Sequence, residues 1–271
     1  MRTTGFLRLL EQDLPLDLAM QDDPVGLQVM DEDRVVTAIG VAYEIDDRVI
    51  DEASRHGVNL LVAFHPLIYP SLSQVVPNGR VGRMVIELIR RGIALHIVHT
   101  AFDAHPRGTS RLLAEGLGLS GITPLVPDAR REGSGMGAVG DLAEPMSVEA
   151  LAARLGEFTS ASVIRVSSPA GAVENGRTVR RIAMLGGSGM SFYRNAIEVG
   201  ADAFITADVR YHGFHEANDA IVVLDPGHAE SESAVVAGMA AVLDATIKRN
   251  GLAIDLVPIL LSTNPVKYIC V

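Results

Sequence analysis

Short runs of β-branched and aliphatic residues alternate along this chain with longer segments of helical period. The first half carries the pattern as VVTAIGVA, DDRVIDEASRHG, VNLLVAF, RVGRMVIELIRRG, IALHIV and TSRLLAEGLGL. This β-α-β order is typical of a largely parallel sheet with helices on both faces, because parallel strands need a crossover connection. The pattern therefore predicts an α/β fold.

The alternation is interrupted once, over residues 121–137. This segment, GITPLVPDARREGSGMG, is rich in proline, glycine and charge and has no clear period. The alternation then resumes and ends in a long helical segment that begins near ESESAVV. We therefore expect two three-layer α/β/α subdomains with mostly parallel or mixed sheets, over residues 1–125 and 126–271.

Composition excludes several classes of protein. The net charge is -10 and the 23 Lys and Arg residues are scattered, which disfavours binding to nucleic acid. The single cysteine, Cys270, excludes an intrachain disulfide and a thiolate zinc site, and favours a reducing compartment. The longest uncharged apolar stretch, 234–243, is too short for a membrane span, and the N-terminus is patterned as an amphipathic helix. We expect a cytoplasmic protein without a membrane partner.

Histidines and carboxylates follow several of the predicted strands. In parallel sheets, ligands gather beyond the carboxyl ends of the strands. Strand 58–64 is followed by His65, strand 93–98 by His99, and strand 203–207 by Asp208. Strand 221–224 is followed by DPGHAESE, which contains His228 and Glu232. These side chains are the candidates for a functional site.

The spacing of these residues favours a metal centre. His228 and Glu232 stand four residues apart at a helix start, so both can reach one ion. His99 and Asp103 repeat this spacing, where we expect a loop. Imidazole with carboxylate suits Zn, Mn, Fe, Co or Ni. Together with His65 the ligands exceed one tetrahedral site, so a two-metal centre would use the surplus.

Other residues have competing interpretations. A lone histidine at a strand end is more often a surface residue than a ligand. His96 fits a buried, hydrogen-bonded histidine, and His56 fits a helix end. His212 lies on a predicted helix and can also serve as a pocket residue or support a ligand. The loop with Gly186, Gly187 and Ser188 can bind phosphate through backbone N–H groups or be a plain tight turn.

Several blocks of the sequence resemble those of the NIF-three-like family, whose members are often labelled GTP cyclohydrolase 1 type 2 homologues. The blocks are DDPVGLQV, FHPLIY, HTAFDAHPRG, GGSGMSFYRNAIEVGADAFITADVRYHGFHEA and LDPGHAESE, in this order. The resemblance implies two similar α/β subdomains, a ring-shaped homo-oligomer that is typically a hexamer, and a dinuclear metal site facing the ring interior.

The resemblance also implies roles for single residues. It makes His65 and Asp103 ligands of one metal, His228 a ligand of the other and Glu232 the bridge, so that the part of the chain from about residue 220 contributes to a shared site. His99 would lie beside the site and could carry a proton.

The chain departs from the family pattern at three places. Phe64 stands where the family usually has a second histidine, so the second ion loses a ligand unless His99 or water replaces it. Pro24 replaces an asparagine, and the family's TGD is Thr206, Ala207 and Asp208 here.

The function that follows is that of a metal-dependent, cyclohydrolase-like hydrolase with one or two divalent ions and a nucleotide-like substrate. Two alternatives stay open. One is a non-catalytic metal-binding protein that forms a ring for assembly or regulation. The other is a metallophosphoesterase that acts on nucleotides, which would release phosphate rather than formate.

Overall fold

A computed structural model describes residues 1–167, 176–218 and 220–269 of the chain. Cys270 lies outside these ranges. The chain divides into two compact units: unit 1 comprises residues 1–102 and 235–265, and unit 2 comprises residues 103–234 and 266–271. Each unit is built around a sheet of its own. Within the described ranges, every helix is too short or too polar to cross a bilayer.

Unit 1 contains a five-stranded sheet in the order β1-β4-β3-β2-β13. Strands β13, β2, β3 and β4 run parallel, and β1 pairs antiparallel with β4. The elements are α1 (Thr3–Asp13), η1 (Leu16–Leu18), β1 (Gly26–Val29), β2 (Ala38–Ala42), α2 (Asp47–Arg55), β3 (Leu60–Ala63), α3 (Arg80–Arg90), β4 (Ala94–Ile97), α4 (His99–Asp103), α10 (Val235–Arg249) and β13 (Asp255–Pro258).

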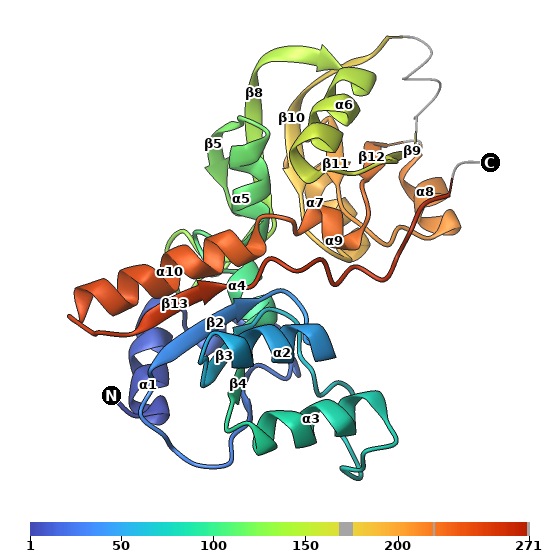
Figure 1. Ribbon diagram of the computed structural model, residues 1–271. Helices are drawn as coiled ribbons and strands as arrows, with labels where there is room; N and C mark the ends of the chain where they lie inside the picture. Colours follow the sequence, from blue (N-terminus) through green and yellow to red (C-terminus); the bar gives the residue numbers. More distant parts are fainter. Residues whose placement is uncertain (168–175, 219, 270–271) are drawn as a thin grey trace. The chain divides into compact units, whose positions relative to one another are not determined.

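Helices cover both faces of this sheet. Alternate strand residues such as Leu61 and Leu95 pack with α2 and α3 in one buried cluster, while α10 packs on β13 and β2 and also contacts α1. Figure 1 shows α2 and α3 on the opposite side of β2 and β13 from α10. Local sequence supports these helices: α2 begins at Asp46, whose side chain accepts a hydrogen bond from the N–H of Val49 (2.9 Å).

Unit 2 contains a six-stranded mixed sheet in the order β5-β8-β10-β11-β12-β9. Strands β10, β11 and β12 are parallel, and β8 and β9 pair antiparallel with β10 and β12. The elements are α5 (Thr109–Gly116), β5 (Ser120–Thr123), β6 (Val126–Pro127), β7 (Gly135–Met136), β8 (Ala138–Ser147), α6 (Val148–Thr159), β9 (Arg165–Ser167), β10 (Thr178–Met184), η3 (Met190–Phe192), α7 (Tyr193–Glu198), β11 (Ala203–Ile205), α8 (Tyr211–Ala217), β12 (Val222–Asp225) and α9 (His228–Ser231).

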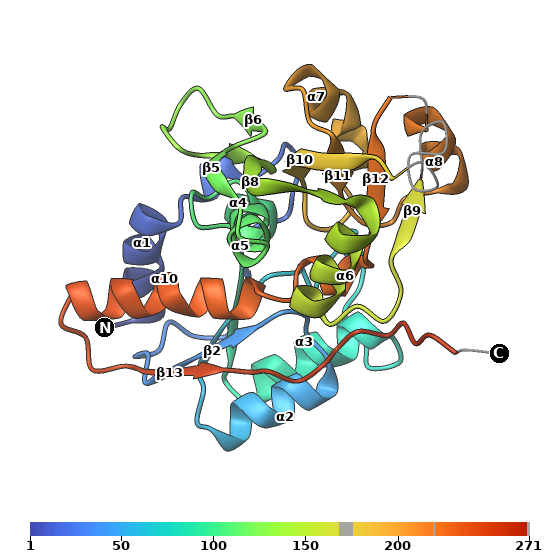
Figure 2. The ribbon, with the colours of Figure 1, turned by 90° about the horizontal axis from the view of Figure 1, so that it is seen from above.

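The second sheet is also covered on both faces. Ile205 and Leu224 belong to a buried cluster with α5 and α6, whereas their neighbours Phe204 and Val223 belong to a cluster with α7 and α8. This alternation follows from side chains that point to opposite faces at successive strand positions. Figure 2 shows α7 on one side of β10 and β11 and α6 on the other. The prediction of two three-layer α/β/α subdomains with mostly parallel or mixed sheets is confirmed.

The two units differ from the ranges 1–125 and 126–271 that the sequence suggested. Helix α5 packs against β8 and strand β5 pairs with it, so the residues from 103 onwards join the second unit. At the other end, β13 pairs in parallel with β2, and α10 packs on the first sheet. The predicted long helix is also divided into α9 and α10. The segment 121–137 therefore lies inside unit 2, where it carries β5, β6 and β7.

Candidate metal centre

His65 stands just beyond the end of β3, where the backbone ladder continues for two residues. Its N–H donates to the carbonyl of Tyr43 (3.0 Å), and its ring packs edge-on against the Tyr43 ring. The ring Nδ1 lies 3.3 Å from Oε2 of Glu44, and Arg80 contacts the other oxygen of that carboxylate. Burial raises the pKa of Glu44, but the adjacent His65 and Arg80 outweigh it and hold the pKa below its usual value.

His99 occupies the corresponding place beyond β4. Its N–H donates to the carbonyl of Phe64 (3.0 Å), and its backbone φ of 25° is uncommon for a residue with a side chain. The ring Nδ1 lies 2.7 Å from Oδ1 of Asp23, and Oδ2 of the same carboxylate accepts hydrogen bonds from the N–H and hydroxyl of Thr100. Burial opposes the charge of Asp23, yet these partners keep its pKa below the usual value. The expected loop here is instead the short helix α4, which runs from His99 to Asp103.

These residues form what we call the first histidine cluster: His65, His99, Asp23 and Glu44, all in unit 1. The centroids of the two imidazole rings are 5.4 Å apart. Both rings pack against the fully buried side chain of Phe64, at 4.9 and 5.5 Å between centroids. The first cluster therefore places two imidazoles side by side at the carboxyl edge of the sheet.

The second histidine cluster comprises His228, Asp208 and Glu232, all in unit 2. His228 begins α9, and its Nδ1 lies 2.6 Å from Oδ2 of Asp208. Its Nε2 lies 3.3 Å from Oε2 of Glu232, whose side chain is only 3% exposed. The predicted spacing of four residues thus brings these two side chains together. Glu232 and then Asp208 raise the pKa of His228 to about 10 against the opposing effect of burial.

The glycine loop after β10 closes against this second cluster. The N–H of Gly186 donates to the hydroxyl of Ser110 (3.2 Å), that of Gly187 to the hydroxyl of Ser231 (2.9 Å), and that of Gly189 to the hydroxyl of Thr206 (2.8 Å). These three N–H groups already donate to hydroxyl groups of the protein, which argues against a phosphate-binding role for the loop. The geometry favours the tight-turn interpretation.

Gly187 gives the Glu232 carboxylate room to approach the backbone. A Cβ at this position would lie 2.4 Å from Oε1 of Glu232 and 3.3 Å from Nε2 of His228, and the backbone φ is +67°. A Gly187→Ala variant should therefore displace the carboxylate and weaken zinc binding by about tenfold, as seen when groups that orient metal ligands are changed. Equilibrium dialysis against Zn²⁺ measures this effect.

Gly200→Ala is the matched control for that variant. Gly200 also has a positive φ (+71°), but no atom lies within 4 Å of its Cβ position. Both variants should lose roughly 1 kcal/mol of stability to backbone strain. Equal zinc affinity in the two variants would contradict a role for Gly187 in placing Glu232.

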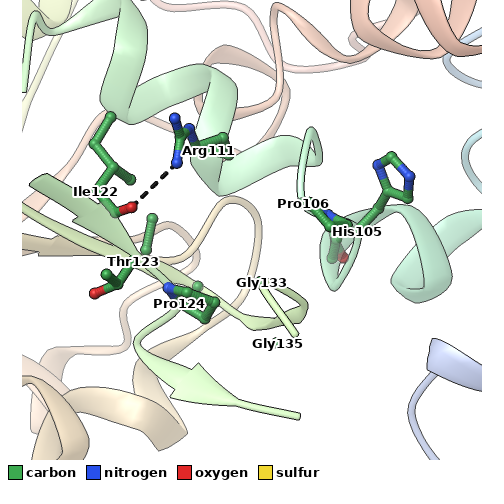
Figure 3. A pocket seen from close by; sticks show the side chains of 11 residues that line it. His105, Pro106, Arg111, Ile122, Thr123, Pro124, Gly133 and Gly135 are labelled. Carbon is green, nitrogen blue, oxygen red and sulfur yellow. Dashed lines mark hydrogen bonds between the residues drawn. The ribbon is translucent and has the colours of Figure 1, made fainter. Parts of the chain in front are cut away.

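Asp103 is the last residue of α4 and belongs to unit 2. It is buried (9% exposed) and lines a small cavity of about 20 Å³ in unit 2, together with His105, Arg111 and Gly135 among others. Figure 3 shows Arg111 reaching from α5 to the carbonyl of Ile122, a hydrogen bond of 3.1 Å, while the His105 ring turns away from Thr123 and Pro124. Arg111 also donates a hydrogen bond to Glu115, and its side chain lines the cavity.

The remaining histidines have other surroundings. His212 is exposed on α8 and packs against the Tyr211 ring, and no contact with the second cluster is recorded for it within the described ranges. His56 follows the last residue of α2, as expected, and lies 3.1 Å from Glu52. His96 is buried (1% exposed), but the expectation of a hydrogen bond is wrong: within the described ranges neither ring nitrogen has a partner. Burial lowers the pKa of His96 to about 4.

Sequence reasoning missed Asp23 and Glu44 as supporting carboxylates. Neither has a histidine at helical spacing, so no local pattern marks them. The signal that could have found them is position: Glu44 follows β2 by two residues, at the same carboxyl edge as His65 and His99.

The donors of the two clusters suit a transition metal. His99 and His228 each have a carboxylate at hydrogen-bonding distance from Nδ1, which leaves Nε2 as the ligand nitrogen, and metal-binding histidines in proteins usually show this arrangement. Glu44 lies 3.3 Å from Nδ1 of His65. The buried Glu232 carboxylate needs a positive charge beside it. Protonated His228 supplies this charge, and a divalent ion would supply it when it displaces that proton. The residues therefore fit such an ion.

Comparison with known proteins gives a consistent match across the chain. The family model described as Duf34/NIF3 (NGG1p interacting factor 3) matches residues 1–265. A Streptomyces coelicolor protein named GTP cyclohydrolase 1 type 2 homolog is 36% identical over 256 residues, covering 92% of this chain and 88% of that protein. A Streptococcus pneumoniae protein of the same name is 29% identical over 271 residues, covering 99% and 100%.

Solved structures show the same fold. The crystal structure of Staphylococcus aureus protein SA1388 matches with a TM-score of 0.91 at 25% identity and covers 99% of both chains. Reduced HcgD from Methanocaldococcus jannaschii matches with a TM-score of 0.75 at 24% identity, covering 95% of this chain and 97% of that one. The second likeness concerns the fold alone.

Proposed function

Because the chain belongs to the Duf34/NIF3 family, we propose that it is a metal-dependent hydrolase that acts on a nucleotide-like substrate. The observation that carries the proposal is the repeated pairing of an imidazole with a carboxylate at strand ends: His65 with Glu44, His99 with Asp23, and His228 with Asp208. The names of the two bacterial relatives support a GTP-like substrate.

We propose that His65, Asp103, His228 and Glu232 belong to one centre of one or two divalent ions, as the family resemblance implies. In this assignment His65 and Asp103 bind one ion, His228 binds the other and Glu232 bridges them. Imidazole and carboxylate ligands favour Zn, Mn, Fe, Co or Ni.

In this proposal, carboxylates of the chain orient the histidines that would bind the metal. Asp208 accepts the Nδ1 proton of His228 and so directs Nε2 towards Glu232, while the Glu44 carboxylate lies 3.3 Å from Nδ1 of His65. The Glu232 carboxylate is buried, 3.3 Å from Nε2 of His228. A bound divalent ion would supply Lewis acidity and lower the pKa of a water molecule towards neutrality. In a GTP-like substrate the attacked atom would be the imidazole carbon of guanine, with formate as a product.

One observation favours a second candidate, a non-catalytic metal-binding protein that serves in assembly or regulation. Phe64 is fully buried beside His65 and His99, where its side chain contributes no ligand atom. A centre with fewer ligands can hold a metal without turnover.

Product analysis tests the proposal. Protein reconstituted with Zn²⁺, Mn²⁺, Fe²⁺ or Co²⁺ is incubated with GTP, and formate and inorganic phosphate are both measured. We expect formate in a metal-dependent reaction. Release of phosphate alone would identify a phosphoesterase, and bound metal without either product would favour the non-catalytic candidate.

We also propose that the chain forms a ring-shaped homo-oligomer, with six subunits as the expected number, and that it works in the cytoplasm. The family resemblance supports the first statement, and the single cysteine supports the second. Light scattering after size exclusion gives the subunit number.

A further inference from the structure

The role of His99 goes beyond the proton carrier predicted from the sequence. We propose that His99 is a metal ligand in this chain, and that it shares an ion with His65. This inference rests on the proposed metal-dependent function and concerns the composition of the same centre.

The first argument is the distance between the two rings. An ion bound to two imidazoles lies about 2.1 Å from each ligand nitrogen, and at a tetrahedral angle this places the ring centroids roughly 5 Å apart. The observed separation of His65 and His99 is 5.4 Å with the rings inclined at 58°. The separation of the two rings is therefore close to the one that a shared ion requires.

The second argument is the orientation of the ligand atoms. Nδ1 of His99 lies 2.7 Å from Oδ1 of Asp23, so Nε2 is the nitrogen that this ring offers to a metal, and Nδ1 of His65 lies 3.3 Å from Glu44. The same arrangement directs Nε2 of His228 towards Glu232. His99 thus has the supporting carboxylate that the two predicted histidine ligands have.

The third argument is the construction of the turn that carries His99. Asp23 is nearly buried, with a side chain 7% exposed, and holds Thr100 through both its N–H and its hydroxyl. The Thr100 hydroxyl in turn accepts the N–H of Met20 (2.9 Å). These contacts hold His99 at its φ of 25°, a conformation that costs about 1 kcal/mol or more and is found preferentially at functional sites. A surface histidine would not require such support.

The side chain of Phe64 bears on which residue can be the second imidazole ligand. Its buried ring packs against both imidazoles. Because Phe64 offers no ligand atom, the second imidazole beside His65 is His99.

Metal binding without substrate tests this assignment. Zinc per chain is measured by inductively coupled plasma mass spectrometry after equilibrium dialysis, and Co²⁺ binding is followed by visible absorption, for wild type, His99→Gln and the control His56→Gln. His56 is an exposed histidine of the same unit. We expect His99→Gln to lose one ion per chain or to bind at least tenfold more weakly, with an altered Co²⁺ spectrum, while His56→Gln matches wild type.

A second variant covers the case in which His99→Gln fails to fold. Asp23→Asn keeps the imidazole but changes the partner that orients it, and changes of this kind lower metal affinity by about 10- to 100-fold. Circular dichroism establishes that each variant is folded.

The outcomes separate this proposal from the proposed function. Unchanged zinc content and Co²⁺ spectrum in a folded His99→Gln would overturn the assignment, and a loss of activity alone in that variant would make His99 a proton carrier. A wild type that binds metal but hydrolyses nothing would contradict the hydrolase proposal and leave the ligand assignment to be decided by the binding data.

Discussion

A Glu232→Gln variant is expected to lose metal and hydrolytic activity together, with activity reduced by at least about 100-fold. Changing a group that only supports a ligand already costs about 10- to 100-fold, and Glu232 is placed to bind directly. Its carboxylate is almost fully buried, 3.3 Å from Nε2 of His228. Glutamine keeps the size of the side chain but removes its charge. Metal content per chain and turnover of the active substrate measure the effect.

Glu216→Gln is the control for this variant, because Glu216 is an exposed carboxylate of the same unit. It should bind metal and turn over like wild type. If Glu232→Gln kept its full metal content, Glu232 would not be a bridging ligand.

The second large effect concerns stability in acid, and its source is His96. Burial lowers the pKa of this histidine to about 4 in the folded protein, below the usual value of about 6.5 for an unfolded chain. Between these values the unfolded state binds more protons, so the free energy of unfolding decreases as the pH falls from about 6.5 to about 4. The difference in pKa corresponds to roughly 3 kcal/mol. At neutral pH this stability is fully present.

Urea unfolding of wild type and His96→Leu at pH 7, 6, 5 and 4 checks this prediction. As the pH falls, the free energy of unfolding should decrease more in wild type than in His96→Leu. At pH 7 the variant should be at least as stable as wild type, because the two unpartnered ring nitrogens are removed. Parallel pH profiles would show that His96 does not titrate in this way.

Much of the fold was predictable because local pattern and tertiary structure agree. The run from β2 through α2, β3 and α3 to β4 follows the alternation in the sequence, and His65 and His99 stand at strand ends as expected. The return of β13 to the first sheet was not predictable, because the short apolar run near residue 255 fits an edge of either sheet. The boundary at 121–137 failed for a related reason: proline and glycine mark turns within a unit as readily as linkers between units.

The candidate site was predictable where ligands follow a strand or share a helical spacing, as His228 and Glu232 do. Asp23 and Glu44 were missed because their partners are distant in the sequence: Asp23 meets His99 across 76 positions. The sequence suggested that the backbone N–H of Gly187 could bind a ligand. In the structure, the absence of a side chain at Gly187 leaves room for the Glu232 carboxylate. Such roles depend on which segments meet, which no local pattern encodes.

The pairing of β13 with β2 also affects how the chain folds during its synthesis. Asp255 and Ala38 are partners in this ladder although roughly two hundred residues separate them. A growing chain emerges from the ribosome at about 5–20 residues per second. The interval between the synthesis of β2 and that of β13 is therefore about ten seconds or more, which is most of the time needed to synthesise the whole chain. Until then one edge of β2 is unpaired and can pair with another nascent chain. The second unit, whose strands lie between residues 120 and 225, can complete its sheet earlier.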